Sequence, residues 1–219
     1  MIQAIVFDLD GVLIASEKPT FVLLQQILRK YGYKLKDAMY PKRIGIKISV
    51  FVQEIYKDTI STSIQNKITE EFYQEYTQNT EKYISEVPST VQFVKNYKGP
   101  AKLGLVSVSS KKEIQKILKF LGIASCFDFI VSSDDVASLK PDPEIYLKAA
   151  KLSNLTPGAC VAIEDSRIGV ESACRAGFPT YVLLNGFNNK KDFGHLAIKG
   201  FITSEKDLHD LDKRRKEEF

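Results

Sequence analysis

Two aspartates near the start of the chain, Asp8 and Asp10, are the residues whose type and spacing most directly suggest chemistry. They follow an apolar run at residues 5–7, which we expect to be a buried β-strand. Alternate residues of a strand lie on the same side, about 7 Å apart along the backbone, and Gly11 then allows a sharp turn. Carboxylates there are costly to bury unless a metal ion or a substrate uses them. The pair suggests a carboxylate nucleophile beside an acid–base group.

Other polar side chains stand where further strands are expected to end. Ser107 and the acidic pair Glu164 and Asp165 each follow an apolar run, and Lys140 lies in a loop. In a doubly wound sheet, the carboxyl ends of the strands form the ligand crevice. A carboxylate nucleophile, a hydroxyl, a cation and acids for a hard metal ion are together suited to phosphoryl transfer.

The elements that must position these residues alternate between strand and helix in the second half of the chain. This alternation predicts an α/β fold with a doubly wound, Rossmann-like parallel sheet and helices on both faces. We expect strands near residues 3–9, 103–106, 127–131, 160–163, 180–184 and 201–202, and helices at 112–121, at 143–152 and up to about 176.

Residues 16–84 have a different pattern, with apolar side chains at helical spacing, as at Ile64 and Ile68, and no convincing strand. Because the first strand belongs with the later strands, the helical block is expected to be an insertion. We therefore predict an α/β core of residues 1–15 and 85–219 and a small helical domain of residues 16–84.

Composition limits the possible functions. The 219 residues are 44% hydrophobic and 11% aromatic, enough for a sizeable core. The net charge is +4, and the lysines are spread along the chain, which suits anionic substrates but not nucleic acid as a partner. Three cysteines without a CxxC pair argue against a disulfide framework or a zinc site.

No apolar run approaches the length of a membrane span. The N-terminal apolar stretch is short and carries Asp8 and Asp10, which is unlike a signal peptide. We expect a cytoplasmic protein, because three cysteines without a CxxC pair fit a reducing compartment. We also expect no membrane partner, and a monomer or weak homo-oligomer.

The motifs resemble, in order and spacing, those of the haloacid dehalogenase superfamily of aspartate-nucleophile phosphohydrolases. Within it, the chain most resembles the branch of β-phosphoglucomutases and sugar-phosphate phosphatases, and its helical block resembles the cap inserted after the family's first motif. The matching segments are the DxDGxx motif at residues 8–13, the strand end at 105–109, the lysine motif at 140–146 and the acidic motif at 164–170.

The resemblance implies roles for the acidic residues. Asp8 would attack phosphorus and form an aspartyl-phosphate, and Asp10 would protonate the leaving oxygen and later deprotonate water. Mg²⁺ would be the cofactor, held by the Asp8 carboxylate, the Asp10 carbonyl, Glu164 and Asp165.

The same resemblance implies that the remaining core residues hold the phosphoryl group. Ser107 and the Val108 N–H would bind a phosphoryl oxygen, Ser109 would add a hydrogen bond, and Lys140 would pair with Asp8 and the phosphoryl group.

Residues that differ from those of known family members limit the type of reaction that we expect. Dehalogenases lack the second aspartate, so Asp10 favours phosphate esters. β-Phosphoglucomutases carry a histidine that matches Thr20 here, and their phosphate-binding cap arginine has no clear counterpart, although Arg43 and Lys47 lie nearby as candidate substrate-binding residues.

We therefore expect a Mg²⁺-dependent phosphatase acting on a small phosphorylated metabolite, such as a sugar phosphate. A β-phosphoglucomutase-like phosphotransferase is the first alternative, and a non-catalytic protein that binds phosphorylated ligands is the second.

Overall fold

The computed structural model describes residues 2–43 and 45–214. The chain divides into two compact units. One consists of Met1–Ile14 with Glu86–Phe219, and the other is Ala15–Ser85.

The first unit is built on a six-stranded sheet in the order β5-β4-β1-β6-β7-β8, in which every neighbouring pair is parallel. Strands of such a sheet are covered on both faces, so their sequences are nearly continuous apolar runs. The predicted α/β fold with a doubly wound parallel sheet is confirmed. The strands are β1 (Ala4–Asp8), β4 (Lys102–Val106), β5 (Phe129–Val131), β6 (Cys160–Glu164), β7 (Thr180–Leu183) and β8 (Gly200–Ile202).

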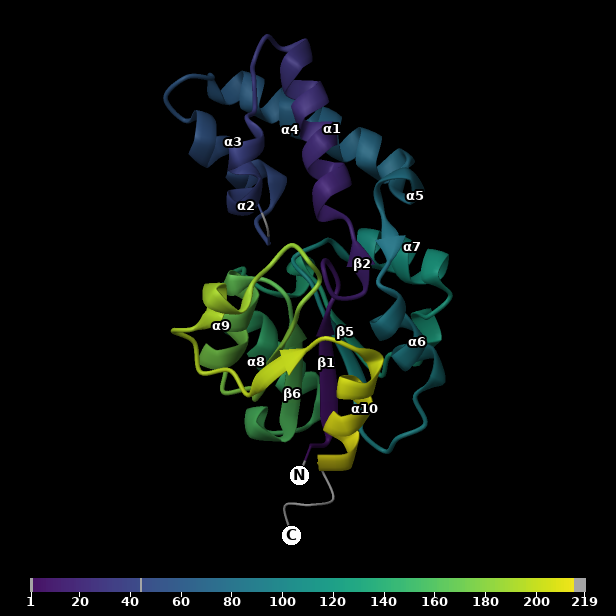
Figure 1. Ribbon diagram of the computed structural model, residues 1–219. Coiled ribbons are helices and arrows are strands. Elements are labelled where there is room, and N and C mark those ends of the chain that lie inside the picture. Colours follow the sequence, from purple (N-terminus) through teal and green to yellow (C-terminus); the bar gives the residue numbers. More distant parts are fainter. Residues whose placement is uncertain (1, 44, 215–219) are drawn as a thin grey trace. The chain divides into compact units, whose positions relative to one another are not determined.

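Helices cover both faces of this sheet (Figure 1). Successive residues of β1 point to opposite faces. Val6 packs in a core cluster with Tyr146 of α8 (Glu144–Ser153), whereas the Phe7 ring lies 6.1 Å from that of Phe93 in α6 (Pro88–Asn96). The longer helices are α6 (Pro88–Asn96), α7 (Lys111–Leu121), α8 (Glu144–Ser153), α9 (Arg167–Arg175) and α10 (Glu205–Arg214). Short 3₁₀ turns are η2 (Ala124–Cys126), η3 (Ser133–Asp135), η4 (Pro157–Ala159) and η5 (Lys190–Phe193).

Helix α7 begins and ends at residues that the local sequence makes suitable. Ser110 accepts a hydrogen bond from the Glu113 N–H, and the Glu113 carboxylate accepts one from the Ser110 N–H, which forms a capping box. Gly122 follows the helix with a φ of 68°, a left-handed conformation that favours glycine. This capping box fixes the direction of α7 just after the loop that contains Ser107.

The second unit is helical, as its periodicity predicts. Phe21, Leu24, Ile27 and Leu28 of α1 (Glu17–Lys30) are buried, and α1 packs against α4 (Thr62–Gln78). Its helices are α1 (Glu17–Lys30), η1 (Asp37–Met39), α2 (Tyr40–Arg43), α3 (Ile48–Tyr56), α4 (Thr62–Gln78) and α5 (Thr80–Tyr83). Where the chain passes between the units, β2 (Ile14–Ala15) and β3 (Ser85–Glu86) form a two-stranded sheet.

None of the helices in the described part of the chain combines the length and apolar character that a membrane span requires.

Candidate active site

The sheet register brings the predicted strand-end residues together around the end of β1. Asp8 is the last residue of β1 and lies opposite Val106, so Ser107 comes directly after its neighbour on β4. On the other side, Phe7 lies opposite Ile163, which places Glu164 next along β6. Neighbouring strands are about 4.8 Å apart. Strands β4 and β5 lie on one side of β1 in the sheet, and β6, β7 and β8 lie on the other. Such a switch point in the strand order is the expected ligand site of an open α/β sheet.

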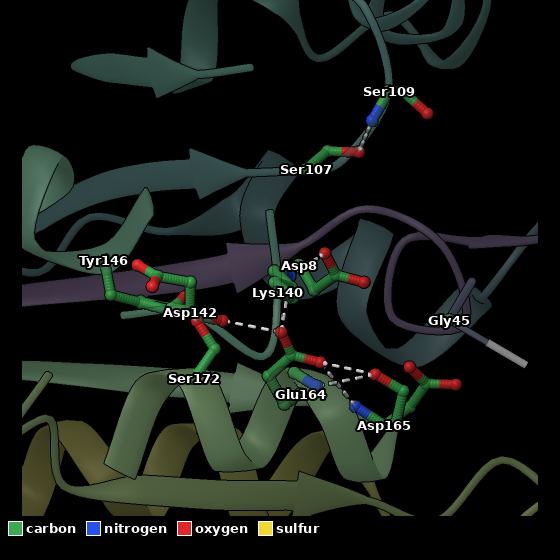
Figure 2. A network of polar contacts seen from close by, with 12 residues as sticks. Asp8, Gly45, Ser107, Ser109, Lys140, Asp142, Tyr146, Glu164, Asp165 and Ser172 are labelled. Carbon is green, nitrogen blue, oxygen red and sulfur yellow. Dashed lines mark hydrogen bonds and ion pairs between the residues drawn. The ribbon is translucent and has the colours of Figure 1, made fainter. Parts of the chain in front are cut away.

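Lys140 connects the nucleophile candidate to the acidic pair. Its Nζ lies 2.6 Å from Asp8 Oδ1 and 2.6 Å from Glu164 Oε1, and its side chain is only 3% exposed (Figure 2). Burial alone would lower the pKa of Lys140, but the charges of Asp8 and Glu164 outweigh that effect and raise it. Lys140 is therefore an ammonium ion held between two carboxylates.

The pKa of the Asp8 carboxyl is subject to two opposing effects. Burial raises the pKa of its carboxyl well above the usual value, and the neighbouring Lys140 ammonium opposes that rise. A divalent cation beside Asp8 would oppose it further. The positive charges around Asp8 thus decide whether it is present as the carboxylate that a nucleophile requires.

Tyr146 is a further member of this cluster that sequence analysis did not identify. It is fully buried, and its hydroxyl donates a hydrogen bond of 2.7 Å to Glu164 Oε1. The Lys140 Nζ lies over its ring, 5.4 Å from the centroid. Burial and the Glu164 charge raise the pKa of Tyr146, so it remains a neutral donor. Its position on the buried face of a helix was the available signal, because a buried tyrosine hydroxyl usually needs a partner.

An acidic cluster fits a hard cation. Asp8, Glu164 and Asp165 are all buried, and one carboxylate oxygen from each lies within 4.8 Å of the others. Glu164 Oε1 is occupied by Lys140 and Tyr146, whereas Oε2 accepts only long hydrogen bonds, 3.3 Å from the Asp165 N–H and 3.4 Å from the Ser166 hydroxyl. Three carboxylates beside one ammonium leave a negative site, and oxygen ligands are those that Mg²⁺ prefers.

Asp10 lies on the turn that follows β1. The Gly11 N–H donates to the Ile14 carbonyl at 2.7 Å, and Asp10 pairs with Ile14 as an isolated bridge. The turn keeps Asp10 half-buried, two residues beyond Asp8. Its side chain is not part of the acidic cluster found among the described residues, and the use of its carbonyl toward the metal ion stays a prediction.

Two glycines allow the acidic pair to approach the backbone. A Cβ on Gly11, which has a φ of +76°, would lie 1.8 Å from Asp165 Oδ2. A Cβ on Gly169 in α9 would lie 2.1 Å from Glu164 Oε2. Both carboxylates therefore occupy space that any other residue at these two positions would fill.

Gly169→Ala is expected to lower the free energy of unfolding by roughly 1–3 kcal/mol, as overpacking of a close contact does. The same substitution should also weaken Mg²⁺ binding, because Glu164 must move. Thermal unfolding and calorimetric titration with Mg²⁺ would measure both effects. Gly158→Ala is the matched control, since a Cβ there meets nothing within 4 Å. Equal stability and Mg²⁺ affinity in the two variants would contradict the expectation.

The loop after β4 is organised around the Ser107 side chain. Ser107 is fully buried, and its N–H donates to the Val131 carbonyl at 3.0 Å. Its hydroxyl oxygen accepts a hydrogen bond of 3.0 Å from the Ser109 N–H, as Figure 2 shows. Val108 and Ser109 are half-buried. The backbone of the loop thus orients the Ser107 hydroxyl at the carboxyl end of β4.

Arg43 and Lys47 belong to the helical unit. Arg43 is 8% exposed, and its Nη1 lies 3.0 Å from Glu17 Oε2 and donates to the Ile46 carbonyl at 2.9 Å. The Gly45 N–H donates to the other oxygen of Glu17 at 3.2 Å. The Arg43 charge is therefore balanced within this unit, whereas Lys47 is half-buried directly before α3. Substrate binding by these two residues stays a prediction.

The sequence model of haloacid dehalogenase-like hydrolases matches residues 5–183, a span that contains the whole strand-end cluster. The chain belongs to this family. The resemblance drawn from the four motifs is thereby confirmed.

Known relatives of this haloacid dehalogenase-like hydrolase include phosphatases and a mutase. The phosphorylated carbohydrates phosphatase of Thermotoga maritima is 30% identical over 216 residues, covering 95% of this chain and 98% of that protein. The β-phosphoglucomutase of Bacillus subtilis is 28% identical over 183 residues, 80% of each chain. The crystal structure of a hydrolase from Pseudomonas syringae shares the fold, with a TM-score of 0.82 at 23% identity over 96% of this chain and 98% of that one.

Proposed function

We propose that this haloacid dehalogenase-like hydrolase is a Mg²⁺-dependent phosphatase of small phosphorylated metabolites, with sugar phosphates as the first candidates. The observation that carries the proposal is the position of Lys140, whose ammonium bridges Asp8 and Glu164 at 2.6 Å each beside Asp165. The phosphatase relative of similar length supports the reaction class.

The proposed reaction has two displacements at phosphorus. An Asp8 oxygen attacks phosphorus while the ester P–O bond breaks, and Asp10 gives its proton to the departing oxygen. The product is an aspartyl-phosphate on Asp8. Water then attacks the same phosphorus and gives its proton to Asp10, and the bond between phosphorus and the Asp8 oxygen breaks. Inorganic phosphate leaves, and both aspartates return to their initial state.

The other residues of the site would balance charge and hold the phosphoryl oxygens. Lys140 opposes the negative charge on Asp8 and on the phosphoryl group, and the Ser107 hydroxyl, the Val108 N–H and Ser109 donate to a phosphoryl oxygen. Bound Mg²⁺ would supply positive charge to the phosphoryl oxygens from a set formed by the Asp8 and Asp165 carboxylates, Glu164 and the Asp10 carbonyl.

We further propose that the helical unit acts as a cap that selects the leaving group, with Arg43 and Lys47 as candidate contacts. Its first helix also favours hydrolysis over mutase chemistry. Thr20 occupies the position that matches the mutase histidine, and its hydroxyl donates to the carbonyls of Ser16 at 2.7 Å and Glu17 at 3.1 Å. A threonine bonded to its own helix cannot supply the proton transfers of an imidazole near neutral pH.

Phosphate release from a panel of phosphorylated sugars, nucleotides and small acids would test the proposal. We expect release with Mg²⁺ and its loss in EDTA, because the carboxylates of the site need a cation to bind an anionic substrate. Readdition of Mg²⁺ should restore the activity, which serves as the control for irreversible damage. Absence of release from the whole panel, together with isomerisation of a sugar phosphate that requires a bisphosphate primer, would replace the phosphatase by the mutase.

A further inference from the structure

Asn185 follows β7 in the α/β unit. It contacts both the turn after β1 and the acidic pair after β6. Its Nδ2 donates to Asp165 Oδ2 at 2.8 Å and to the Gly11 carbonyl at 3.0 Å, and its Oδ1 accepts from the Phe187 N–H at 3.1 Å. Rotating the amide by half a turn would set its oxygen against two other oxygens. The three contacts therefore fix the orientation of the Asn185 amide.

A second asparagine holds the same loop in place. Asn188 Nδ2 donates to the Asp165 carbonyl at 2.7 Å and to the Leu183 carbonyl at 2.9 Å, and its Oδ1 accepts from the Asn185 N–H at 3.4 Å. The loop after β7 is thus attached to Asp165 through both its backbone and its side chain. Asn185 lies on a well-supported loop and can orient the carboxylate that it contacts.

The Asp165 carboxylate is confined from two directions. The backbone of Gly11 lies so close to Asp165 Oδ2 that no Cβ fits between them. Asn185 donates to that same oxygen. An ion bound through both oxygens of Asp165 would have to share Oδ2 with the Asn185 amide and lie close to the Gly11 backbone, which disfavours that mode of binding.

We propose that Asn185 is a positioning residue that makes Asp165 a single-oxygen metal ligand and thereby favours Mg²⁺ over Ca²⁺ at this site. The inference rests on the proposed function, which places a divalent cation beside Asp165. Mg²⁺ requires near-octahedral coordination at about 2.1 Å, whereas Ca²⁺ accepts six to eight oxygens and bidentate carboxylates. A carboxylate restricted to one oxygen suits the smaller ion.

Calorimetric titration of the full chain with Mg²⁺ and separately with Ca²⁺ tests this inference without any substrate. For Asn185→Ala we expect Mg²⁺ to bind roughly 10–100-fold more weakly, the usual effect of losing a partner that orients a ligand. Ca²⁺ binding should change less, so the preference for Mg²⁺ should fall. Asn189→Ala is the matched control, because Asn189 lies in the same loop but caps η5.

Two results would overturn the inference: unchanged Mg²⁺ affinity in Asn185→Ala, or an equal loss of affinity for both ions. Asn185→Ser, whose hydroxyl is too short to reach both acceptors, takes its place if the alanine variant does not fold. Failure of the proposed function is recognised separately. A wild-type protein that binds Mg²⁺ but releases no phosphate would refute the phosphatase and leave the inference standing, whereas a wild-type protein that binds no Mg²⁺ would refute the inference itself.

Discussion

Asp8→Asn is expected to lower phosphate release by roughly 10⁴-fold or more, the order of effect seen when an enzyme loses its nucleophile. The amide oxygen carries no negative charge and cannot form the aspartyl-phosphate. The fold should persist, because asparagine has the shape of aspartate and Lys140 keeps its contact with Glu164. Phosphate release with saturating Mg²⁺ and a thermal unfolding curve would measure both properties.

Two further observations make the Asp8 experiment specific. Wild-type protein quenched during turnover should carry a phosphate that hydroxylamine removes, since hydroxylamine cleaves acyl phosphates, and Asp8→Asn should carry none. Asp58→Asn provides the control, because Asp58 is an exposed aspartate of the helical unit. Turnover near the wild-type rate in pure Asp8→Asn protein would refute the assignment of the nucleophile.

Lys140→Met is expected to reduce both activity and stability. Loss of the charge facing the phosphoryl group should lower turnover by roughly 10²–10³-fold, as removal of a donor to a developing anion does. Leaving Asp8 and Glu164 buried without their shared cation should lower the free energy of unfolding by about 3–5 kcal/mol. Phosphate release and denaturant unfolding would test the two effects. Lys112→Met, at an exposed position of α7, is the control.

The stability loss in Lys140→Met should depend on pH in a defined direction. Burial already raises the pKa of Asp8, and Lys140 opposes that rise. Without Lys140 the pKa rises further above its unfolded value, so the folded state favours the protonated acid. Stability is then retained at low pH, below the unfolded pKa of about 4, and lost as pH rises through the folded pKa.

The pH trend and a double variant separate a charge effect from a packing effect. In Lys140→Met/Glu164→Gln, one of the two buried carboxylates is neutral, so much of the lost stability should return while activity stays low. A deficit in Lys140→Met that is the same from pH 4 to pH 9, and that Glu164→Gln does not relieve, would indicate that the lysine stabilises the fold by packing alone.

The sheet and its strand-end residues were predictable because they depend on local patterns. Apolar runs that alternate with amphipathic helices determine a parallel sheet, and every strand of such a sheet ends at the same edge. Asp8, Ser107 and the acidic pair can therefore be placed together from the sequence alone. The same rule would also have selected Asn185, which directly follows the strand predicted at residues 180–184, had amide side chains been considered alongside charged ones.

The contacts that define the site depended on the tertiary structure. Lys140 lies 132 residues from Asp8 and 24 from Glu164 along the chain, and as a loop lysine it had no local signal for burial. Its positive charge suggested a role in phosphoryl transfer, and the family resemblance implied that it pairs with Asp8. Tyr146 contacts Glu164, which is 18 residues away, and Asn185 contacts Asp165, which is 20 residues away. Sequence spacing does not predict contacts over such separations.

By itself, the sequence determined that strands and helices alternate, that the strands form a parallel sheet and which acidic residues stand at the strand ends. Hydrophobic periodicity is a local property of a few residues, and the common direction of parallel strands applies to the whole sheet. Both can therefore be recognised in the sequence. Only the tertiary structure decided that one ammonium is buried between two carboxylates, that glycines leave room for the acidic pair and that an asparagine donates a hydrogen bond to Asp165. Those features depend on side-chain packing between distant segments, where shifts of about 1 Å decide which atoms can bond.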